Sequence, residues 1–96
     1  MIVSFTDRGT KDVFDGLRTH DAERACPDSL RGLATRRMDL LNTAGTVDDL
    51  TGVPSARVEE LDGELAGHHA MPLGGGHSIC FRWTDEGPES VGIVAS

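Results

Sequence analysis

The sequence has no long apolar run, and its longest ones, residues 1–3 and 91–95, are far shorter than the roughly 20 residues that a membrane helix needs. It also lacks the basic start and the following apolar stretch of a secretory signal, because charged residues are scattered through its beginning. We therefore expect neither a membrane span nor export, and we expect a cytoplasmic protein.

Basic residues are scarce. Nine Lys and Arg stand against 16 Asp and Glu, which gives a formal net charge of −7. Residues 1–45 carry seven basic and seven acidic side chains, whereas residues 46–96 carry nine acidic side chains and two basic ones, Arg57 and Arg82. Because phosphate is repelled unless positive charge is concentrated locally, this composition disfavours non-specific nucleic-acid binding.

Aromatic residues and cysteines are also few, with three Phe, one Trp, no Tyr and two Cys. Cys26 and Cys80 stand far apart in a chain without an export signal, so we expect buried thiols rather than a disulfide. An apolar content of 38% still fills a small core. Ninety-six residues then make a single domain over 1–96 the expected organisation.

The first half of the chain predicts one short strand and two helices. Residues 2–5 form a β-type run that ends in a turn at 7–9. Thr10 is the expected N-cap of a short helix of one or two turns that carries Val13, Phe14 and Leu17. Residues 19–24 are polar and predict a connection. A longer helix is expected to begin at Pro27 or Asp28 and to stop at Gly45. Its apolar stripe consists of Leu30, Leu33, Ala34, Met38 and Leu41.

The second half predicts strands. A loop over residues 48–54, with one helical turn at 48–50, leads to four short runs of strand type, at 57–61, 67–73, 78–84 and 90–94. The turns between them are Asp62-Gly63, Gly74-Gly75-Gly76 and Glu86-Gly87-Pro88. Helices followed by strands predict an α+β fold, with the short N-terminal strand and two helices packed on a C-terminal antiparallel β-meander.

Two details of the strands bear on side-chain placement. Alternation puts Ile79, Phe81 and Trp83 on one face of their strand and Cys80 and Arg82 on the other. Pro72 lacks a backbone donor, which predicts a bulge, an edge or a shortened strand at that position.

Two possible ligand sites are weak on spacing. His68, His69, His77 and Cys80 suggest zinc, but adjacent strand residues, and residues three apart, point to opposite faces, so a zinc site is disfavoured. The three glycines at 74–76 suggest a phosphate loop, but a strand rather than a helix follows them, which favours a hairpin turn.

His69 is the best single candidate for acid–base chemistry, because histidine titrates near neutrality and His69 lies in a polar stretch. No second catalytic group follows from the spacing. The alternative is an ordinary surface histidine in a strand.

Several segments together resemble a known family. They are Met1-Ile-Val-Ser-Phe, Cys26-Pro-Asp-Ser-Leu, Arg57-Val-Glu-Glu-Leu-Asp-Gly, Gly67-His-His, Ile79-Cys-Phe-Arg-Trp-Thr-Asp and Gly87-Pro-Glu-Ser-Val-Gly-Ile-Val. In this order they are similar to the HigB-type toxins of the RelE superfamily, the plasmid maintenance killer proteins. The resemblance implies a RelE-like fold, a helix-turn-helix, HigA-like antitoxin as partner, and ribosome-dependent cleavage of mRNA without a metal or other cofactor. Operator DNA would be contacted only through the antitoxin.

The resemblance also implies site residues. His69 takes the place of a catalytic histidine, and Arg57 and Arg82 take the places of arginines that bind RNA phosphate. Pro72 and Ser78 stand where the family implies arginine, and Ala95-Ser96 stands where it implies an Asp-Tyr-His tail.

We therefore expect a weak or impaired mRNA endonuclease. The alternative is a catalytically inactive module that binds an antitoxin and contributes to autoregulation of transcription. In either case the surface of Arg31, Arg36 and Arg37 is a candidate contact for an acidic partner.

Overall fold

The computed structural model describes residues 1–61 and 67–95. Helices fill the first half and strands the second, so the predicted α+β class is confirmed. The helical elements are α1 (Arg8–Phe14), α2 (His20–Ala25), α3 (Asp28–Thr43), α4 (Val47–Thr51) and the 3₁₀ helix η1 (Pro54–Ala56). The strands are β1 (Glu59–Glu60), β2 (His68–Gly74), β3 (His77–Thr84) and β4 (Gly87–Ala95).

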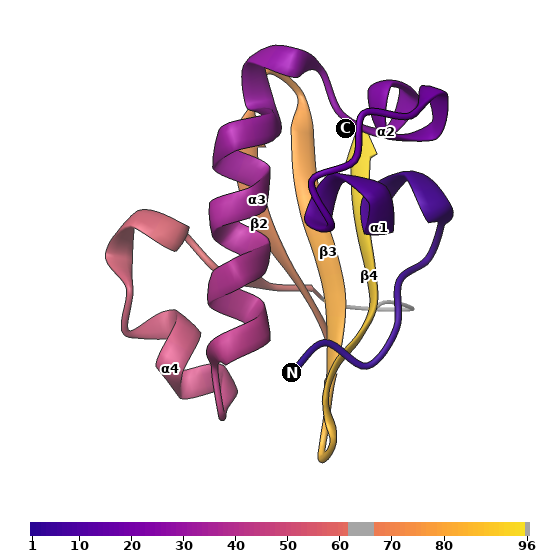
Figure 1. Ribbon diagram of the computed structural model, residues 1–96. Coiled ribbons are helices and arrows are strands. Elements are labelled where there is room, and N and C mark those ends of the chain that lie inside the picture. Colours follow the sequence, from indigo (N-terminus) through magenta and orange to yellow (C-terminus); the bar gives the residue numbers. More distant parts are fainter. Residues whose placement is uncertain (62–66, 96) are drawn as a thin grey trace.

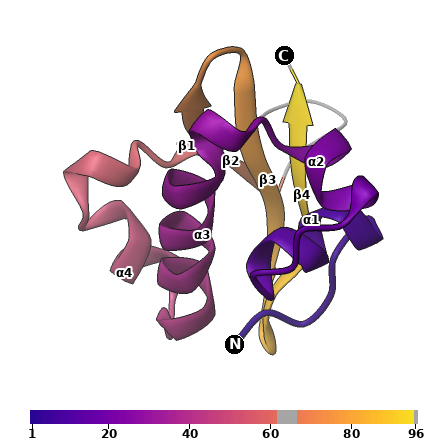
Figure 2. The same ribbon diagram turned by 45° about the horizontal axis from the view of Figure 1, so that its top comes forward.

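The four strands form one antiparallel sheet in the order β1-β2-β3-β4, which confirms the predicted meander. Helices α1 and α3 lie against one face of this sheet, with α3 over β2 and α1 over β4 (Figures 1 and 2). We call this the helix face, and the opposite side of the sheet the outer face. The packing buries a core between sheet and helices whose largest members are Phe81, Met38, Leu41, Leu50, Met71 and Ile79.

Helix α3 follows its predicted pattern. Pro27 stands at its N-cap, and of the predicted stripe Ala34, Met38 and Leu41 are fully buried while Leu30 and Leu33 pack at the rim of the core. The helix ends at Thr43, with Ala44 as its C-cap, just before the predicted stop at Gly45. Neither α3 nor any other helix within residues 1–61 and 67–95 is long and apolar enough to cross a membrane.

The helical half differs from the prediction in the N-cap of α1 and in the presence of α2. Asp7, not Thr10, caps α1: its carboxylate accepts the backbone N–H of Thr10 at 3.1 Å, so the predicted turn at 7–9 instead begins the helix. The predicted polar connection contains α2, which is capped by the Thr19 hydroxyl. A polar sequence forms this helix because Ala22 is buried against α1, an apolar contact too small to produce a visible periodicity.

The predicted N-terminal strand is a single parallel bridge between Phe5 and Val91. Around it the backbone N–H of Val3 donates to Pro88 at 2.8 Å, and the N–H of Thr6 donates to Val91 at 2.9 Å. The segment thus runs along the free edge of β4 without the continuous ladder of a strand, and it covers part of that edge.

The two hairpins turn within two residues. Gly75 and Gly76 have φ of 60° and 80°, the left-handed values that a two-residue hairpin needs and that glycine adopts readily. The β3–β4 turn is Asp85-Glu86, whereas Gly87 and Pro88 already belong to β4, so the predicted turn is placed too far along the chain. The predicted turn at Asp62-Gly63 lies outside the described residues.

Both long ladders carry a register shift. Between β2 and β3 the shift lies between Pro72 and Gly74, which confirms the irregularity predicted for the proline. Between β3 and β4 it lies between Cys80 and Arg82, opposite Ser90, whose φ is 51°. These shifts decide which side chains share a face of the sheet.

Candidate functional site

One row of ionisable residues crosses three strands on the outer face. Arg82, in the inner strand β3, lies directly opposite His68 of β2 on one side and Glu89 of β4 on the other. Directly opposed residues of neighbouring strands project to the same face, so the three side chains are neighbours. Cys80 belongs to the next row of the same face, between Ala70 and Gly92.

Arg82 is already engaged in this row. Its guanidinium Nη1 lies 3.5 Å from Oε1 of Glu89, and the two side chains are 57% and 32% exposed. Glu59, which pairs with Ala70, adds a second carboxylate to the same face. A pair this exposed is weak, so an incoming phosphate competes for Arg82 with a neighbouring carboxylate rather than with a buried one.

His69 projects to the helix face. It lies opposite Phe81, and their rings stack with centroids 5.6 Å apart and planes inclined by 14°. Phe81 is fully buried, and Nδ1 of His69 is buried with no hydrogen-bond partner among the described residues. The structure therefore does not bring His69 and Arg82, two residues nominated from the sequence, to the same face.

The shift in β2 is the reason for this separation. Gly74 pairs with His77 beside the turn, and continuing that register would set His69 opposite Arg82. One extra residue, Leu73, enters β2 before Pro72 pairs with Ser78, so every later pair moves by one position. From the sequence alone, His68 is considered as a zinc ligand and not as a catalytic residue. The signal in the sequence for its position beside Arg82 is Pro72, which predicts an irregularity in the strand.

Arg57 lies away from this row. It caps η1 in the left-handed conformation, with φ of 51°, and its side chain is exposed. It precedes β1, the edge strand next to β2, whereas Arg82 lies in β3. The two arginines nominated as phosphate ligands are thus separated by a strand of the sheet.

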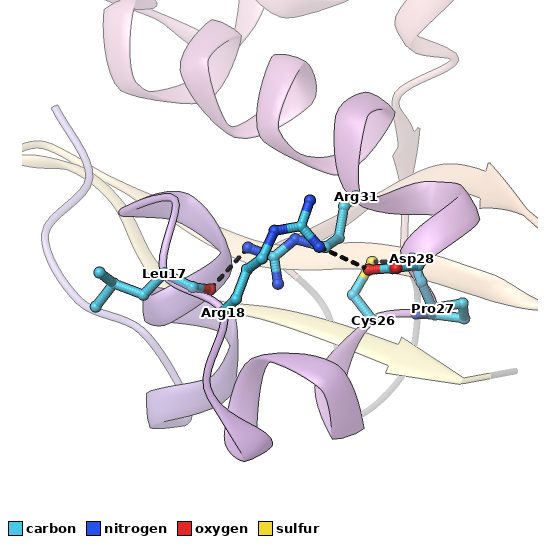
Figure 3. Close-up of polar contacts among 6 residues, drawn as sticks. All are labelled: Leu17, Arg18, Cys26, Pro27, Asp28 and Arg31. Carbon is cyan, nitrogen blue, oxygen red and sulfur yellow. Dashed lines mark hydrogen bonds and ion pairs between the residues drawn. The ribbon is translucent and has the colours of Figure 1, made fainter.

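The arginines of α3 are partly used within the fold. Arg31 donates from Nη2 to the carbonyl oxygen of Leu17 at 2.7 Å, and Arg18 lies 3.4 Å from the Asp28 carboxylate beside it (Figure 3). Arg37 similarly donates to the carbonyl oxygen of Ser55 at 2.8 Å. Arg31 and Arg37, two members of the predicted arginine surface, therefore form hydrogen bonds that connect α3 to the backbone of other segments.

The two cysteines are free thiols. Burial raises the pKa of the Cys80 thiol. Burial also raises the pKa of Cys26, against the opposing effect of the nearby Arg31 charge. Within residues 1–61 and 67–95, no three His, Cys, Asp or Glu side chains gather in an arrangement that holds a metal ion.

Two shallow pockets lie on the helical side of the molecule rather than at the outer face. Volumes of about 410 and 580 Å³ open along α1 and α2, and both are lined by Arg8 and Asp21. Both linings contain acidic and basic side chains, so neither pocket has the charge of one sign that selects a phosphate group.

Comparison with known proteins identifies a toxin to which this chain is similar. The chain is 26% identical over 85 residues to Toxin HigB-1 of Vibrio cholerae serotype O1, which covers 88% of this chain and 86% of that protein. The chain is similar to a HigB-type toxin. The similarity spans both the helical half and the sheet and so confirms the resemblance to this branch of the RelE superfamily. No protein-family model matches the chain.

Proposed function

We propose that residues 1–96 form a single toxin domain of a type II toxin-antitoxin system that acts in the cytoplasm with a helix-turn-helix, HigA-like antitoxin as partner. The observation that carries the proposal is the similarity to Toxin HigB-1 along nearly the whole of both chains. An α+β fold with an antiparallel meander is consistent with it.

The activity that follows is ribosome-dependent cleavage of mRNA. In such a reaction the ribose 2′-hydroxyl attacks the adjacent phosphorus, and the protein supplies a proton acceptor and a cation for the crowded phosphate. Arg82 is the cation on the outer face, whereas Arg57 and His69, the other two residues nominated from the sequence, lie away from it. The Glu89 carboxylate beside Arg82 supports a weak activity, because it offsets the charge offered to phosphate.

A second candidate is a catalytically inactive toxin-like module that binds the antitoxin and contributes to autoregulation. The specific observation in its favour is the separation of His69 from Arg82 by the thickness of the sheet. Operator DNA would then be reached only through the antitoxin, because the sheet half carries two basic residues against nine acidic ones.

Toeprinting of mRNA on ribosomes, with and without the purified protein, separates the two candidates. New cleavage at the ribosomal A site supports the endonuclease. Intact mRNA, beside an active HigB-1 control, favours the binding module if the protein still co-purifies with an antitoxin. Failure of both assays contradicts the toxin proposal itself.

A further inference from the structure

We infer that His68, and not its neighbour His69, is the proton-transfer residue of the proposed cleavage, with Arg82 beside it as the phosphate ligand. This inference rests on the proposed function and deepens it. The juxtaposition of His68 and Arg82 on the outer face is the observation that carries it.

The pairing geometry brings the two side chains close. The backbone carbonyl of His68 accepts the N–H of Leu61 at 2.9 Å, so the backbone polar groups of His68 point toward the β1 side. Toward β3, His68 and Arg82 then form a pair without mutual hydrogen bonds, in which Cα atoms lie about 4.5 Å apart and the side chains are closest. An imidazole and a guanidinium at that spacing reach the same phosphodiester.

His69 has a structural role instead. Its ring is stacked on Phe81, which is fully buried, and its Nδ1 is enclosed. A side chain held in this way on the helix face contributes apolar contact and lies on the wrong side of the sheet for a substrate bound at Arg82.

One histidine is enough for the proton transfers of this reaction. Neutral His68 takes the proton of the ribose 2′-hydroxyl as the 2′-oxygen forms its bond to phosphorus, and the bond from phosphorus to the 5′-oxygen breaks. The departing 5′-oxygen takes a proton from water, and the imidazolium of His68 returns its proton to solvent. The products are a 2′,3′-cyclic phosphate and a 5′-hydroxyl, with Arg82 neutralising charge that develops on the phosphate oxygens.

Glu89 then limits the reaction, since it occupies Arg82 in the absence of RNA. A substrate phosphate has to replace this carboxylate. Removing the Glu89 charge is therefore expected to strengthen the contact between Arg82 and RNA, whereas removing an acidic charge elsewhere on the hairpin is not.

The test compares two adjacent histidines with the same replacement. His68→Phe and His69→Phe each remove an imidazole and keep a ring, and His69→Phe preserves stacking on Phe81. On programmed ribosomes we expect His68→Phe to lower the cleavage rate by at least about 100-fold, the ordinary worth of a general base. We expect His69→Phe to stay within about threefold of the unmodified chain, with far-ultraviolet circular dichroism confirming that both variants are folded.

Two further arms identify the chemistry. Added imidazole restores cleavage to His68→Gly if the lost group is a proton acceptor, which a purely structural role does not allow. Glu89→Gln raises the cleavage rate above that of the matched variant Glu86→Gln, whose exposed carboxylate lies at the β3–β4 turn, and Arg82→Ala cancels the gain.

The possible results distinguish an incorrect assignment of His68 from an incorrect assignment of the endonuclease activity. Loss of cleavage in His69→Phe with full activity in His68→Phe overturns the inference and leaves the endonuclease standing. Full activity in both variants also overturns it. Intact mRNA with the unmodified chain, beside active HigB-1, removes the proposed endonuclease and the inference together.

Discussion

The Thr10 hydroxyl accepts the backbone N–H of Ile93 at 3.0 Å and so joins the first helix to the last strand across 83 residues of sequence. The same hydroxyl donates to the Asp7 carboxylate at 2.8 Å, and that carboxylate also caps α1. Thr10 is fully buried, although nothing in the sequence distinguishes it from an ordinary N-cap. The edge of β4 is thus satisfied here by a side chain rather than by another strand.

Thr10→Val should therefore destabilise the fold with almost no change of shape. The substitution leaves the N–H of Ile93 without an acceptor in a buried site, which costs about 1–3 kcal/mol. Thr43→Val is the matched control, because the Thr43 hydroxyl is exposed and bonds only to carbonyls of its own helix. Urea denaturation measures both. Equal losses in the two variants would show that the bond from Thr10 to Ile93 contributes nothing particular.

Replacing two helical glycines by alanine should change the free energy of unfolding in opposite directions. A Cβ at Gly9 would meet the Asp21 carbonyl oxygen and would lie 2.8 Å from Cβ of Ala25, so Gly9→Ala forces α1 away from α2. We expect a loss of about 1–3 kcal/mol. At Gly32 the nearest atom is the flexible end of Arg36 at 3.9 Å, so Gly32→Ala gains up to about 1 kcal/mol of helix propensity. Thermal denaturation of the pair measures the difference, and a stabilised Gly9→Ala variant would contradict the close packing of α1 on α2.

Ser90 holds a left-handed conformation, with φ of 51°, at the irregularity of β4. Glycine adopts this conformation without steric cost, and the N–H that donates to the Ser4 hydroxyl at 2.9 Å is kept. We expect Ser90→Gly to raise the free energy of unfolding by about 0.5 kcal/mol. Ser78→Gly, in β3 at a residue without a left-handed φ, is expected to lower it by a similar amount. A loss in both variants would rule out relief of strain at Ser90.

The sequence predicted the architecture better than the site. The stripe from Leu30 to Leu41 and the alternation through Phe81 depend on period alone, and both are confirmed. Which histidine lies opposite Arg82 depends instead on the number of residues in β2 between the turn and that pair. One extra residue shifts the pairing by one position and so exchanges His69 for His68. Pro72 predicted an irregularity, but a proline alone does not decide between a bulge, an edge and a shortened strand.

The two thiols should be slow to react and should differ from one another. Burial raises the pKa of both, which lowers the thiolate fraction at neutral pH, and only the thiolate reacts with iodoacetamide. Cys26 is 1% exposed and Cys80 is half-buried, so Cys80 is expected to be alkylated first, and both more slowly than in urea. Peptide mass spectrometry over time measures the order, and faster labelling of Cys26 would contradict the packing between α2 and α3.

The same shifts have a consequence for stability at high pH. A thiol whose pKa is higher in the folded state contributes stability that is complete below the unfolded value, about 8.5, and is lost as pH rises through the folded value. The free energy of unfolding should then fall above about pH 8.5. Cys80→Ala should reduce that fall, and an unchanged fall would exclude Cys80 as its source.

Pro72 protects an edge of the sheet. The carbonyl of His68 accepts from Leu61, so the backbone groups of alternate residues, Ala70 and Pro72, also point toward the β1 side. β1 pairs with β2 only at Ala70 and His69, and among the described residues no strand lies beside Pro72. The proline therefore removes a donor from an open edge without breaking a bond to β3.

Pro72→Thr should accordingly leave the fold intact and make it associate. The new N–H points outward, so no internal bond is gained and the free energy of unfolding should change by less than about 1 kcal/mol. Sedimentation at rising protein concentration should show dimers or larger species that the unmodified chain does not form. Ser78→Thr is the control, because Ser78 lies opposite Pro72 in a strand paired on both sides. Association of both variants would point to threonine itself rather than to the opened edge.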